Sequence, residues 1–493
     1  KTITINHSEW STMKVVFKAT KEAQKARLVI TPLTAGSVDL DMVSLFPRKT
    51  FKGRKNGLRA DLAQVIADMK PKFVRFPGGC AAHGNGLDNM YLWKRTIGKL
   101  EERQHMPNIW NYHQTLGLGY YEYFLFCEDI GAEPLPVIPA AVPCQNSWHG
   151  GHGQQGGVPM EEMDNFIQDI LDLIEWANGD AKTTKWGRVR AEAGHPKPFN
   201  LKYIGVGNEQ WGKEYPERLE VFIKAIRAKY PDINIIGSSG PYRGGEWFDD
   251  LWAAMRTMDV QLVDEHYYAG ELFFEQNADR YDSYPRKGPK VFAGEYACHG
   301  VDGRKWNHFN ASLLEAAFMT GLERNADIVH MASYAPLLAH VEGWQWRPDM
   351  IWFDNLDVML SCSYHVQKMY STNCGTHSLS IKMDEENVTG QRGLYASAVR
   401  DEVKRQYIIK VANLADEAQE ISLQFKGLSR KETLDCPVTC TILHSDDPYA
   451  ENTLENPDAI VPVTSVIEPS SWYKNTLTTS IGPRTFVVFT MEY

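Results

Sequence analysis

The stretch Leu201-Lys-Tyr-Ile-Gly-Val-Gly-Asn-Glu209 has the pattern of a buried strand that ends in a reactive side chain. A helical stretch follows at 217–229, and a second apolar run follows at 233–238. A strand, a helix and another strand of these lengths form a βαβ unit, whose two strands lie parallel. This stretch therefore predicts an α/β fold built on a parallel sheet.

The same alternation extends in both directions along the chain. Further helical stretches are predicted at 58–69, 160–176 and 310–324. The predicted strands are 72–76, 134–139, 201–206, 233–238, 262–267, 290–295 and 328–333. This run of strands approaches the eight of a closed (β/α)8 barrel, so we predict a TIM-type barrel over residues 48–375 whose first strand is absent from this chain.

The residues on both sides of the predicted barrel have the pattern of β structure. Residues 1–47 hold room for about three strands, at 13–20, 26–31 and 38–43, which is too few to bury a sheet independently. We therefore interpret 1–47 as the C-terminal part of a β module. Residues 376–493 are predicted to form a C-terminal β-sandwich, and its strands are expected at 405–411, 418–425, 437–443 and 485–490.

The composition is that of a globular protein and excludes several classes of partner. Of the 493 residues, 43% are hydrophobic and 23% charged, and the formal net charge is −10. A net negative charge argues against nucleic acid, and no apolar run reaches the ~18 residues of a membrane helix. The eight cysteines are scattered, so most are predicted to be reduced. The compartment is not indicated, and secreted, periplasmic and cytoplasmic locations all stay open.

Two glutamates end predicted strands at positions where barrel enzymes carry their catalytic groups. Glu209 follows strand 201–206 and Glu295 ends strand 290–295, which would be the fourth and seventh strands of a complete barrel. Two carboxylates that flank one cavity suit glycoside hydrolysis: one protonates the leaving oxygen, and the other attacks the anomeric carbon or activates water. The alternative is that each glutamate merely caps a following helix.

Other polar groups are predicted at the same ends of the strands. Arg75 ends strand 72–76 and can hold a carboxylate ionised, although a structural ion pair is the alternative. His266 and Tyr268 lie two residues apart, so they share a strand face and can bond a carboxylate or a sugar hydroxyl. Asn208 can donate to a ring hydroxyl. The tryptophans that can stack on sugars, with core packing as the alternative, are Trp211, Trp344 and Trp346.

Two apparent cofactor motifs do not have the required context. Gly151-His-Gly-Gln-Gln-Gly156 matches GxGxxG, but no strand runs into it and Pro159 follows. Cys144, His149 and His152 do not have the spacing of a standard zinc site. We predict neither a cofactor nor a metal.

Four of these motifs in combination resemble glycoside hydrolase family 51, the α-L-arabinofuranosidases of clan A. The motifs are Arg75-Phe-Pro-Gly-Gly79, Gly207-Asn-Glu209, His266-Tyr-Tyr268 and Gly294-Glu-Tyr296. Segments 40–47, 53–59, 331–338 and 346–349 are similar to the subgroup with a carbohydrate-binding-like β module before the barrel. The resemblance covers essentially the whole chain.

The resemblance implies an activity and assigns roles to particular residues. It implies a retaining mechanism without a cofactor, in which Glu209 is the acid/base and Glu295 the nucleophile. It also implies that Asn208 contacts the sugar and that Tyr268 lies beside the nucleophile. Members of the family release terminal arabinofuranose from arabinan, arabinoxylan and related side chains, so a carbohydrate is the expected partner.

The chain departs from the family pattern at two places. Many members have Asn after the paired glycines, where this chain has Cys80, so a sugar contact there stays open. The family's first barrel strand carries a substrate-binding Glu in a Phe-Glu-Asp-like context, and only Phe273-Phe-Glu275, in the loop predicted after strand 262–267, is superficially similar. We expect that Lys1 falls inside the β module of a longer polypeptide. The first strand is then missing or supplied by a second chain, because an open barrel exposes strand edges.

The sequence thus predicts a retaining exo-acting α-L-arabinofuranosidase that works by double displacement. Its two carboxyl groups are expected about 5–5.5 Å apart. One alternative is another clan A glycosidase, such as an endo-glucanase or β-xylosidase, and another is a non-catalytic carbohydrate-binding scaffold. The polymer, the linkage and the oligomeric state stay open, including a homo-oligomer.

Overall fold

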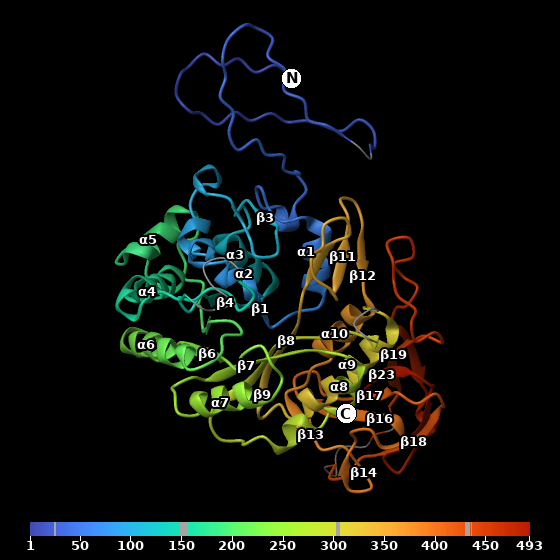
Figure 1. Ribbon diagram of the computed structural model, residues 1–493. Helices are drawn as coiled ribbons and strands as arrows, with labels where there is room; N and C mark the ends of the chain where they lie inside the picture. The colour runs from blue at the N-terminus through green and yellow to red at the C-terminus, as the bar shows by residue number, and fades with distance from the viewer. Residues whose placement is uncertain (24–25, 148–155, 302–305, 429–433, 435) are drawn as a thin grey trace. The chain divides into compact units, whose positions relative to one another are not determined.

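The computed structural model describes the whole chain except residues 24–25, 148–155, 302–305, 429–433 and 435 (Figure 1). The chain divides into two compact units, Lys1–Leu45 and Phe46–Tyr493. The second unit contains the α/β and β regions that the sequence predicts.

A parallel seven-stranded sheet forms the centre of the larger unit. The strand order is β1-β4-β5-β6-β7-β8-β9, so each strand pairs with its neighbour in this series. The strands are β1 (Phe73–Phe76), β4 (Glu133–Ile138), β5 (Tyr203–Val206), β6 (Asn234–Ser238), β7 (Leu262–Ala269), β8 (Lys290–Cys298) and β9 (Val329–Tyr334). All seven predicted strands are confirmed, and within the described residues no pairing joins β1 to β9. The sheet is therefore a TIM-type barrel that lacks one strand.

Helices connect these strands, and their apolar faces pack on the sheet. In α6 the buried residues Tyr215, Leu219, Phe222 and Ile226 recur at helical spacing. The helices are α1 (Ala60–Asp68), α2 (Gly79–His83), α3 (Tyr120–Ile130), α4 (Asp164–Asn178), α5 (Lys185–Glu192), α6 (Glu214–Lys229), α7 (Glu246–Met255), α8 (Glu271–Gln276), α9 (Phe309–Arg324) and α10 (Cys362–Thr372). The segment Phe273-Phe-Glu275 lies in α8, not in a loop.

The interior of the barrel and the space behind it form separate apolar clusters. Inside the sheet, Leu135, Val137, Ile236, Leu262 and Phe292 pack together, so the barrel centre is filled by side chains. The helix α9 is buried almost all round because it contacts β8 on one side and the C-terminal strands β16 and β17 on the other. This helix joins the barrel to the β domain.

The C-terminal region forms two antiparallel sheets, as the sequence predicts. One sheet has the order β13-β16-β17-β23-β19-β20 and the other has the order β18-β22-β21. Their strands are β13 (His377–Leu379), β16 (Leu394–Asp401), β17 (Gln406–Asn413), β23 (Thr485–Glu492), β19 (Val438–His444), β20 (Val463–Ile467), β18 (Gln419–Gln424), β22 (Thr476–Ile481) and β21 (Trp472–Tyr473). A second apolar cluster fills this domain.

Short strands complete the larger unit. A three-stranded sheet, β10-β11-β12, lies between the barrel and the β domain in sequence. The remaining strands are β2 (Met106–Pro107), β3 (His113–Gln114), β10 (Leu338–His340), β11 (Ile351–Phe353), β12 (Val358–Leu360), β14 (Lys382–Met383) and β15 (Glu386–Asn387).

The strands predicted in the N-terminal unit are not formed. The described residues of Lys1–Leu45 contain neither helix nor strand, and large apolar side chains are exposed, with Trp10 at 72% and Leu33 at 76%. The pattern of these residues favours extended backbone, but a strand needs neighbours to pair its N–H and C=O groups and to cover its apolar face. The β module over 1–47 stays a prediction.

Two findings bear on the class of protein. Among the described residues, no helix combines the length and the apolar character needed to cross a membrane. No disulfide joins the described cysteines.

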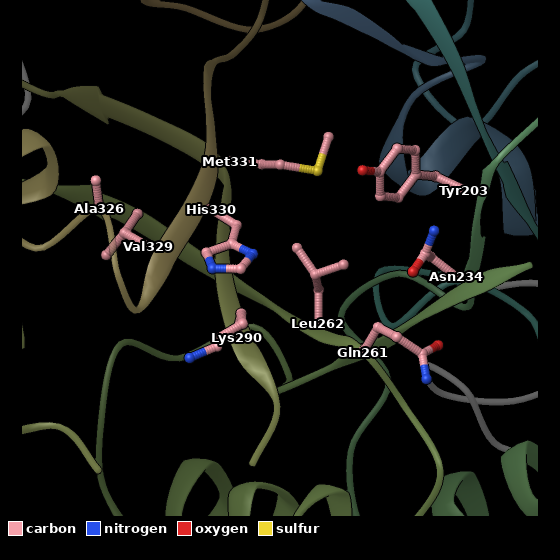
Figure 2. A pocket seen from close by; sticks show the side chains of 9 residues that line it. All are labelled: Tyr203, Asn234, Gln261, Leu262, Lys290, Ala326, Val329, His330 and Met331. Carbon is pink, nitrogen blue, oxygen red and sulfur yellow. The ribbon is translucent and has the colours of Figure 1, made fainter. Parts of the chain in front are cut away.

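A hollow of about 510 Å³ opens at the amino ends of the strands (Figure 2). Five of its lining residues are the first residues of the strands β5 to β9. The lining residues are Tyr203, Asn234, Gln261, Leu262, Lys290, Ala326, Val329, His330 and Met331. This is the end of the sheet opposite to the carboxyl ends, where a barrel enzyme carries its active site.

Candidate active site

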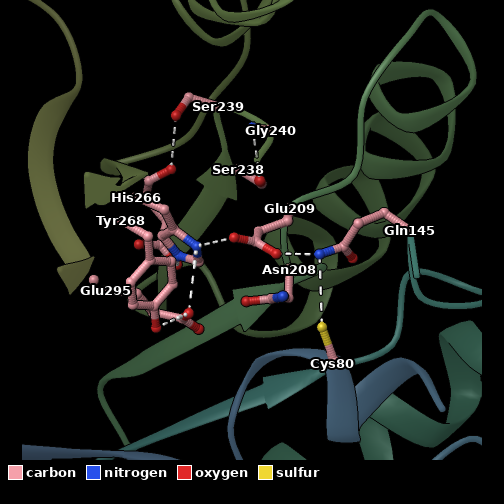
Figure 3. A network of polar contacts seen from close by, with 12 residues as sticks. Cys80, Gln145, Asn208, Glu209, Ser238, Ser239, Gly240, His266, Tyr268 and Glu295 are labelled. Carbon is pink, nitrogen blue, oxygen red and sulfur yellow. Dashed lines mark hydrogen bonds and ion pairs between the residues drawn. The ribbon is translucent and has the colours of Figure 1, made fainter. Parts of the chain in front are cut away.

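The carboxyl ends of four strands bring the predicted site residues together (Figure 3). Arg75 comes from β1, Glu209 from the loop after β5, and Glu295 from β8. His266 and Tyr268 come from β7, where both point inward. Residues that are separated by up to 220 positions in sequence therefore share one polar cluster.

The backbone after β5 turns sharply to present Glu209. Gly207 has φ of 88°, and a Cβ there would lie 2.7 Å from Gln210 Oε1 and from a ring atom of Tyr215. Glu209 itself has φ of 58°, in the left-handed region that non-glycine residues rarely adopt. Such backbone strain is typical of functional sites, where the surrounding structure holds it in place.

Glu295 is held by two donors that are always protonated at neutral pH. Arg75 Nη1 donates to Glu295 Oε1 at 2.7 Å, and the Tyr268 hydroxyl donates to Oε2 at 2.8 Å. Burial lowers the pKa of Arg75, but the charges of Glu295 and Asp264 raise it above its ordinary value. Burial, and after it the charge of Glu295, raises the pKa of Tyr268 well above 10, so the hydroxyl keeps its proton.

Asn208 and Gly79 complete the surroundings of Glu295. Arg75 Nη2 donates to Asn208 Oδ1 at 2.5 Å, which orients the amide. A Cβ on Gly79 would lie 2.7 Å from both the Asn208 amide nitrogen and Glu295 Oε1. Gly79, the second glycine of the pair, is therefore needed for space beside these two side chains.

Glu209 is held by a different kind of donor. His266 Nδ1 lies 2.7 Å from Glu209 Oε1, and the Gln145 amide donates to Oε2. Burial lowers the pKa of His266, but the charges of Glu295, Asp264 and Glu209 raise it well above 6.5. His266 is therefore an imidazolium that can donate from both ring nitrogens.

Asp264 links the two halves of the site, and the sequence reasoning missed it. Its Oδ2 lies 3.2 Å from Arg75 Nη2 and 3.2 Å from His266 Nε2. Asp264 precedes His266 by two residues and so shares its strand face, which is the signal that could have revealed it. A Cβ on Gly294 would lie 1.9 Å from Asp264 Oδ1, so glycine is required there.

Gln145 is the second residue that the sequence reasoning missed. It lies beyond β4 in a loop without periodic pattern, so no signal marked it. Its Nε2 also lies 3.6 Å from Cys80 Sγ. A hydrogen bond with Cys144, together with burial, raises the pKa of Cys80 well above 9, so the thiol is neutral. The structure thus places Cys80 next to the group that holds Glu209.

The predicted tryptophans divide between two locations. The Trp346 ring lies 5.4 Å from the Tyr268 ring and 5.8 Å from that of Trp110, between centroids, so it forms a wall on the Glu295 side. Trp344 packs instead against Arg347, 4.3 Å from its ring centroid. The third, Trp211, stacks on Trp247. Trp346 contacts Tyr268, one of the residues that hold Glu295.

The two carboxylates approach each other closely. One ligand-type atom from each of Glu209, His266 and Glu295 lies within 4.8 Å of the other two. The side chains of Glu209 and Glu295 are 10% and 12% exposed, so they can reach a substrate while most of their surface is shielded from water. The GxGxxG match and both histidines considered for zinc fall wholly or mostly outside the described residues.

Comparison with known proteins identifies the family. The family model "Alpha-L-arabinofuranosidase 1 domain" matches residues 65–286, and the model "Alpha-L-arabinofuranosidase C-terminal domain" matches 294–484. The chain is 35% identical over 490 residues to alpha-L-arabinofuranosidase 1 of Arabidopsis thaliana, covering 98% of this chain and 67% of the relative. The chain belongs to the α-L-arabinofuranosidase family. The resemblance seen in the sequence is thereby confirmed.

Other members of the α-L-arabinofuranosidase family support the assignment. The chain is 46% identical over 445 residues to an extracellular exo-alpha-L-arabinofuranosidase of Streptomyces chartreusis, covering 86% of this chain and 51% of the relative. The arabinose-bound structure of MgGH51 α-L-arabinofuranosidase has a TM-score of 0.79 and 34% identity, covering 90% of this chain and 68% of that one. The chain thus spans about half to two thirds of the length of these arabinofuranosidases.

The candidate site of this arabinofuranosidase-family chain combines residues from both regions that the family models match. Glu209 lies in the first matched region and Glu295 in the second, which begins one residue before it. A more distant solved structure, an arabinose complex of the Thermotoga maritima α-L-arabinofuranosidase, has a TM-score of 0.67 at 20% identity and shows the shared fold.

Proposed function

We propose that this chain is a retaining, exo-acting α-L-arabinofuranosidase that releases terminal arabinofuranose from arabinan- or arabinoxylan-type side chains. The observation that carries the proposal is the approach of Glu209 and Glu295 oxygens to within 4.8 Å, with each carboxylate held by its own donors. The printed names of the relatives support the choice of sugar.

The separation of the carboxylates favours retention of configuration. Retaining glycosidases have their two carboxyl groups about 5–5.5 Å apart, whereas inverting enzymes need roughly 6.5–9.5 Å to hold a water between sugar and base. A distance within 4.8 Å between one oxygen of Glu209 and one of Glu295 is consistent with the shorter, retaining spacing. The mechanism then has two displacements with a covalent intermediate.

In the first displacement Glu295 attacks the anomeric carbon of arabinofuranose. Arg75 and Tyr268 fix its two oxygens and so aim the carboxylate. The bond from the anomeric carbon to the leaving oxygen breaks, and Glu209, which reacts in its protonated form after taking up a proton from solvent, gives that proton to the leaving oxygen. The product is a glycosyl ester on Glu295 and a free leaving alcohol.

In the second displacement Glu209 acts as a base. Now a carboxylate, it takes a proton from water, whose oxygen attacks the anomeric carbon and releases Glu295. His266 and Gln145 donate to the Glu209 carboxylate and stabilise it in this step. We assign Asn208, His266, Cys80 and Trp346 to the pocket that surrounds the sugar.

The stereochemistry of azide rescue tests the proposal. With 2,4-dinitrophenyl α-L-arabinofuranoside, Glu209→Ala should form an arabinosyl azide of α configuration, because azide attacks the ester on Glu295. Glu295→Ala should give the β azide, since azide then replaces the nucleophile. Azides of the opposite configurations, or a fully active Glu295→Ala protein, would refute the assignment.

A substrate comparison separates the proposal from other clan A activities. The parent protein should hydrolyse 4-nitrophenyl α-L-arabinofuranoside much faster than 4-nitrophenyl β-D-xyloside or a cello-oligosaccharide. Preference for either of the latter would instead indicate a xylosidase or an endo-glucanase, and arabinose binding without release would indicate a binding scaffold.

We also propose that the open sheet accepts a further strand. Within the described residues, β1 and β9 are the two edges of the sheet and are not paired with each other. Exposed edges of a parallel sheet offer unpaired backbone groups to another strand. A strand from a second polypeptide, or from another copy of this chain, would close the barrel. Native mass spectrometry tests this: a folded, active and strictly monomeric 493-residue chain would exclude it.

A further inference from the structure

Three aromatic side chains form a cluster near the carboxyl ends of β5 and β6, in which Trp211 is partly buried against the core and the other two are exposed. Trp211 and Trp247 stack at 5.2 Å with their planes 17° apart, and Tyr242 packs against Trp247 at 5.4 Å. Trp211 lies in the loop after β5, Tyr242 in the loop after β6, and Trp247 in the first turn of α7. Yet Trp247 is 42% exposed and Tyr242 is 53% exposed.

An arrangement of this kind points to a ligand. Large aromatic side chains gain free energy when they are buried, so two neighbouring aromatic rings that stay exposed, Tyr242 and Trp247, mark a surface built for binding. The C–H faces of a sugar ring are apolar, while its hydroxyl groups point outward and stay hydrated. A flat, exposed aromatic surface therefore suits a saccharide better than a protein segment.

The position of the cluster indicates which part of a substrate it would meet. Trp211 follows Glu209 by two residues in the same loop. The loop after β6 approaches this loop, because a Cβ on Gly240 would lie 3.5 Å from the Gln210 carbonyl oxygen. Figure 3 shows Gly240 beyond the end of β6, near Glu209. The wall around Glu295 is formed by other aromatic residues, Tyr268 and Trp346.

We propose that Trp211, Tyr242 and Trp247 form a subsite for the leaving saccharide. This inference rests on the proposed function: Glu209 must reach the glycosidic oxygen, so the sugar attached to that oxygen lies next to the Glu209 loop. The arabinofuranose that is released occupies the Glu295 side. The aromatic cluster then stacks on a backbone sugar of the polymer that carries the arabinose.

The expected occupant is a pyranose of a xylan-type backbone. A xylopyranose chair with equatorial hydroxyl groups presents flat C–H faces that match stacked indole rings, whereas a furanose ring is puckered and carries an exocyclic hydroxymethyl group. The subsite should therefore favour arabinoxylan over arabinan, although both offer C–H faces.

The test compares Trp247→Ala with the parent on substrates with and without a leaving sugar. The measured quantity is kcat/KM for arabinoxylo-oligosaccharides divided by kcat/KM for methyl α-L-arabinofuranoside. In Trp247→Ala this ratio should be about tenfold lower than in the parent, which is the loss expected for one well-packed aromatic contact. Tyr242→Ala should lower the ratio less, and Trp247→Phe should restore most of it. Tyr473→Ala is the control, because Tyr473 is 71% exposed in the distant β domain.

Affinity electrophoresis keeps the test independent of turnover. Migration of the parent should be retarded in gels containing arabinoxylan, and less so in gels containing branched arabinan, and Trp247→Ala should remove the difference. If the parent binds arabinoxylan through Trp247 but hydrolyses no arabinofuranoside, the proposed function fails, while saccharide binding by the aromatic cluster stands. An unchanged kcat/KM ratio together with unchanged retardation overturns the subsite, and preferential loss on arabinan overturns the pyranose assignment.

Discussion

The two carboxylates of the site differ in what holds them. Glu295 accepts hydrogen bonds from Arg75 and Tyr268, two groups that remain protonated at neutral pH. Glu209 accepts from His266, which can titrate, and from Gln145, which lies in a loop. We call these groups the nucleophile side and the acid/base side.

This difference matches the tasks proposed for the two carboxylates. A nucleophile needs one fixed charge and one fixed direction, and donors on the strands β1 and β7 provide both. An acid/base group loses a proton in one step and regains it in the next, so its partners must tolerate both forms. Asp264 contacts both Arg75 and His266 and thereby couples the two sides. The predictions below test this division.

The largest effect is expected when the two carboxylates are removed separately. Glu295→Ala should lose at least about 10⁴-fold in kcat/KM with every leaving group, because no covalent intermediate forms. Glu209→Ala should lose about 10²–10⁴-fold with an alkyl arabinofuranoside. With the 2,4-dinitrophenyl glycoside it should lose little, because that leaving group departs without a proton. Equal losses of Glu209→Ala on both substrates would contradict the division.

Removing the group that joins the two sides should have an intermediate effect. Asp264→Asn keeps the size of the side chain but removes its charge, so Arg75 and His266 both lose a partner. We expect a loss of about 10²-fold in kcat/KM. The loss should be similar for alkyl and dinitrophenyl arabinofuranosides, since the nucleophile side is disturbed too. A loss confined to the alkyl substrate would mean that Asp264 acts through His266 alone.

The control for this change is Asp416→Asn. Asp416 pairs with Arg484 at 2.6 Å but is 72% exposed in the β domain. Exposed ion pairs contribute little to stability. This variant should match the parent in both kcat/KM and Tm.

Much of the site could be predicted because strand patterns carry positional information. The carboxyl end of a parallel strand is a defined place, so Arg75 and Glu295 could be assigned to one cluster from sequence alone. Alternation along β7 placed His266 and Tyr268 on one face, and the same rule extended backward by two residues would have added Asp264. All seven barrel strands were predicted because their sequence patterns are those of buried strands.

Other features depend on partners that a local pattern does not contain. Gln145 lies in an irregular loop, where no period links sequence to direction. The first 45 residues have strand-like patterns, yet their described part forms no strand, since a strand exists only when another strand pairs with it. The roles of the eight predicted site residues stay proposals.

A smaller effect is expected from the loop donor on the acid/base side. Gln145→Ala removes a hydrogen bond to the Glu209 carboxylate, and a water molecule can replace part of it, so kcat/KM for an alkyl arabinofuranoside should fall about tenfold. The loss on the dinitrophenyl substrate should be smaller. Asn146→Ala is the control. Asn146 is the next residue in the loop, and its amide nitrogen, like that of Gln145, lies 3.6 Å from Cys80 Sγ. If kcat/KM falls by the same factor in both variants and on both substrates, Gln145 supports the loop and not the acid/base group.

The smallest effect should appear in stability, as a dependence on pH that comes from His266. The folded protein binds the His266 proton more tightly than the unfolded chain, because burial is outweighed by the negative charges of Glu295, Asp264 and Glu209. A raised pKa of this kind stabilises the folded protein fully below the ordinary value of 6.5. That stabilisation is lost as the pH rises through the raised folded pKa.

The Tm difference between the parent and His266→Gln measures this stabilisation. It should shrink from about pH 6 to about pH 9, since only the parent loses a bound proton at this position on unfolding. His377→Gln, at a histidine whose side chain is 59% exposed and which lies outside the site, is the control variant. If the difference for His266→Gln instead grows with pH, His266 is neutral in the folded protein, and the acid/base side would then lack the charged donor that distinguishes it from the nucleophile side.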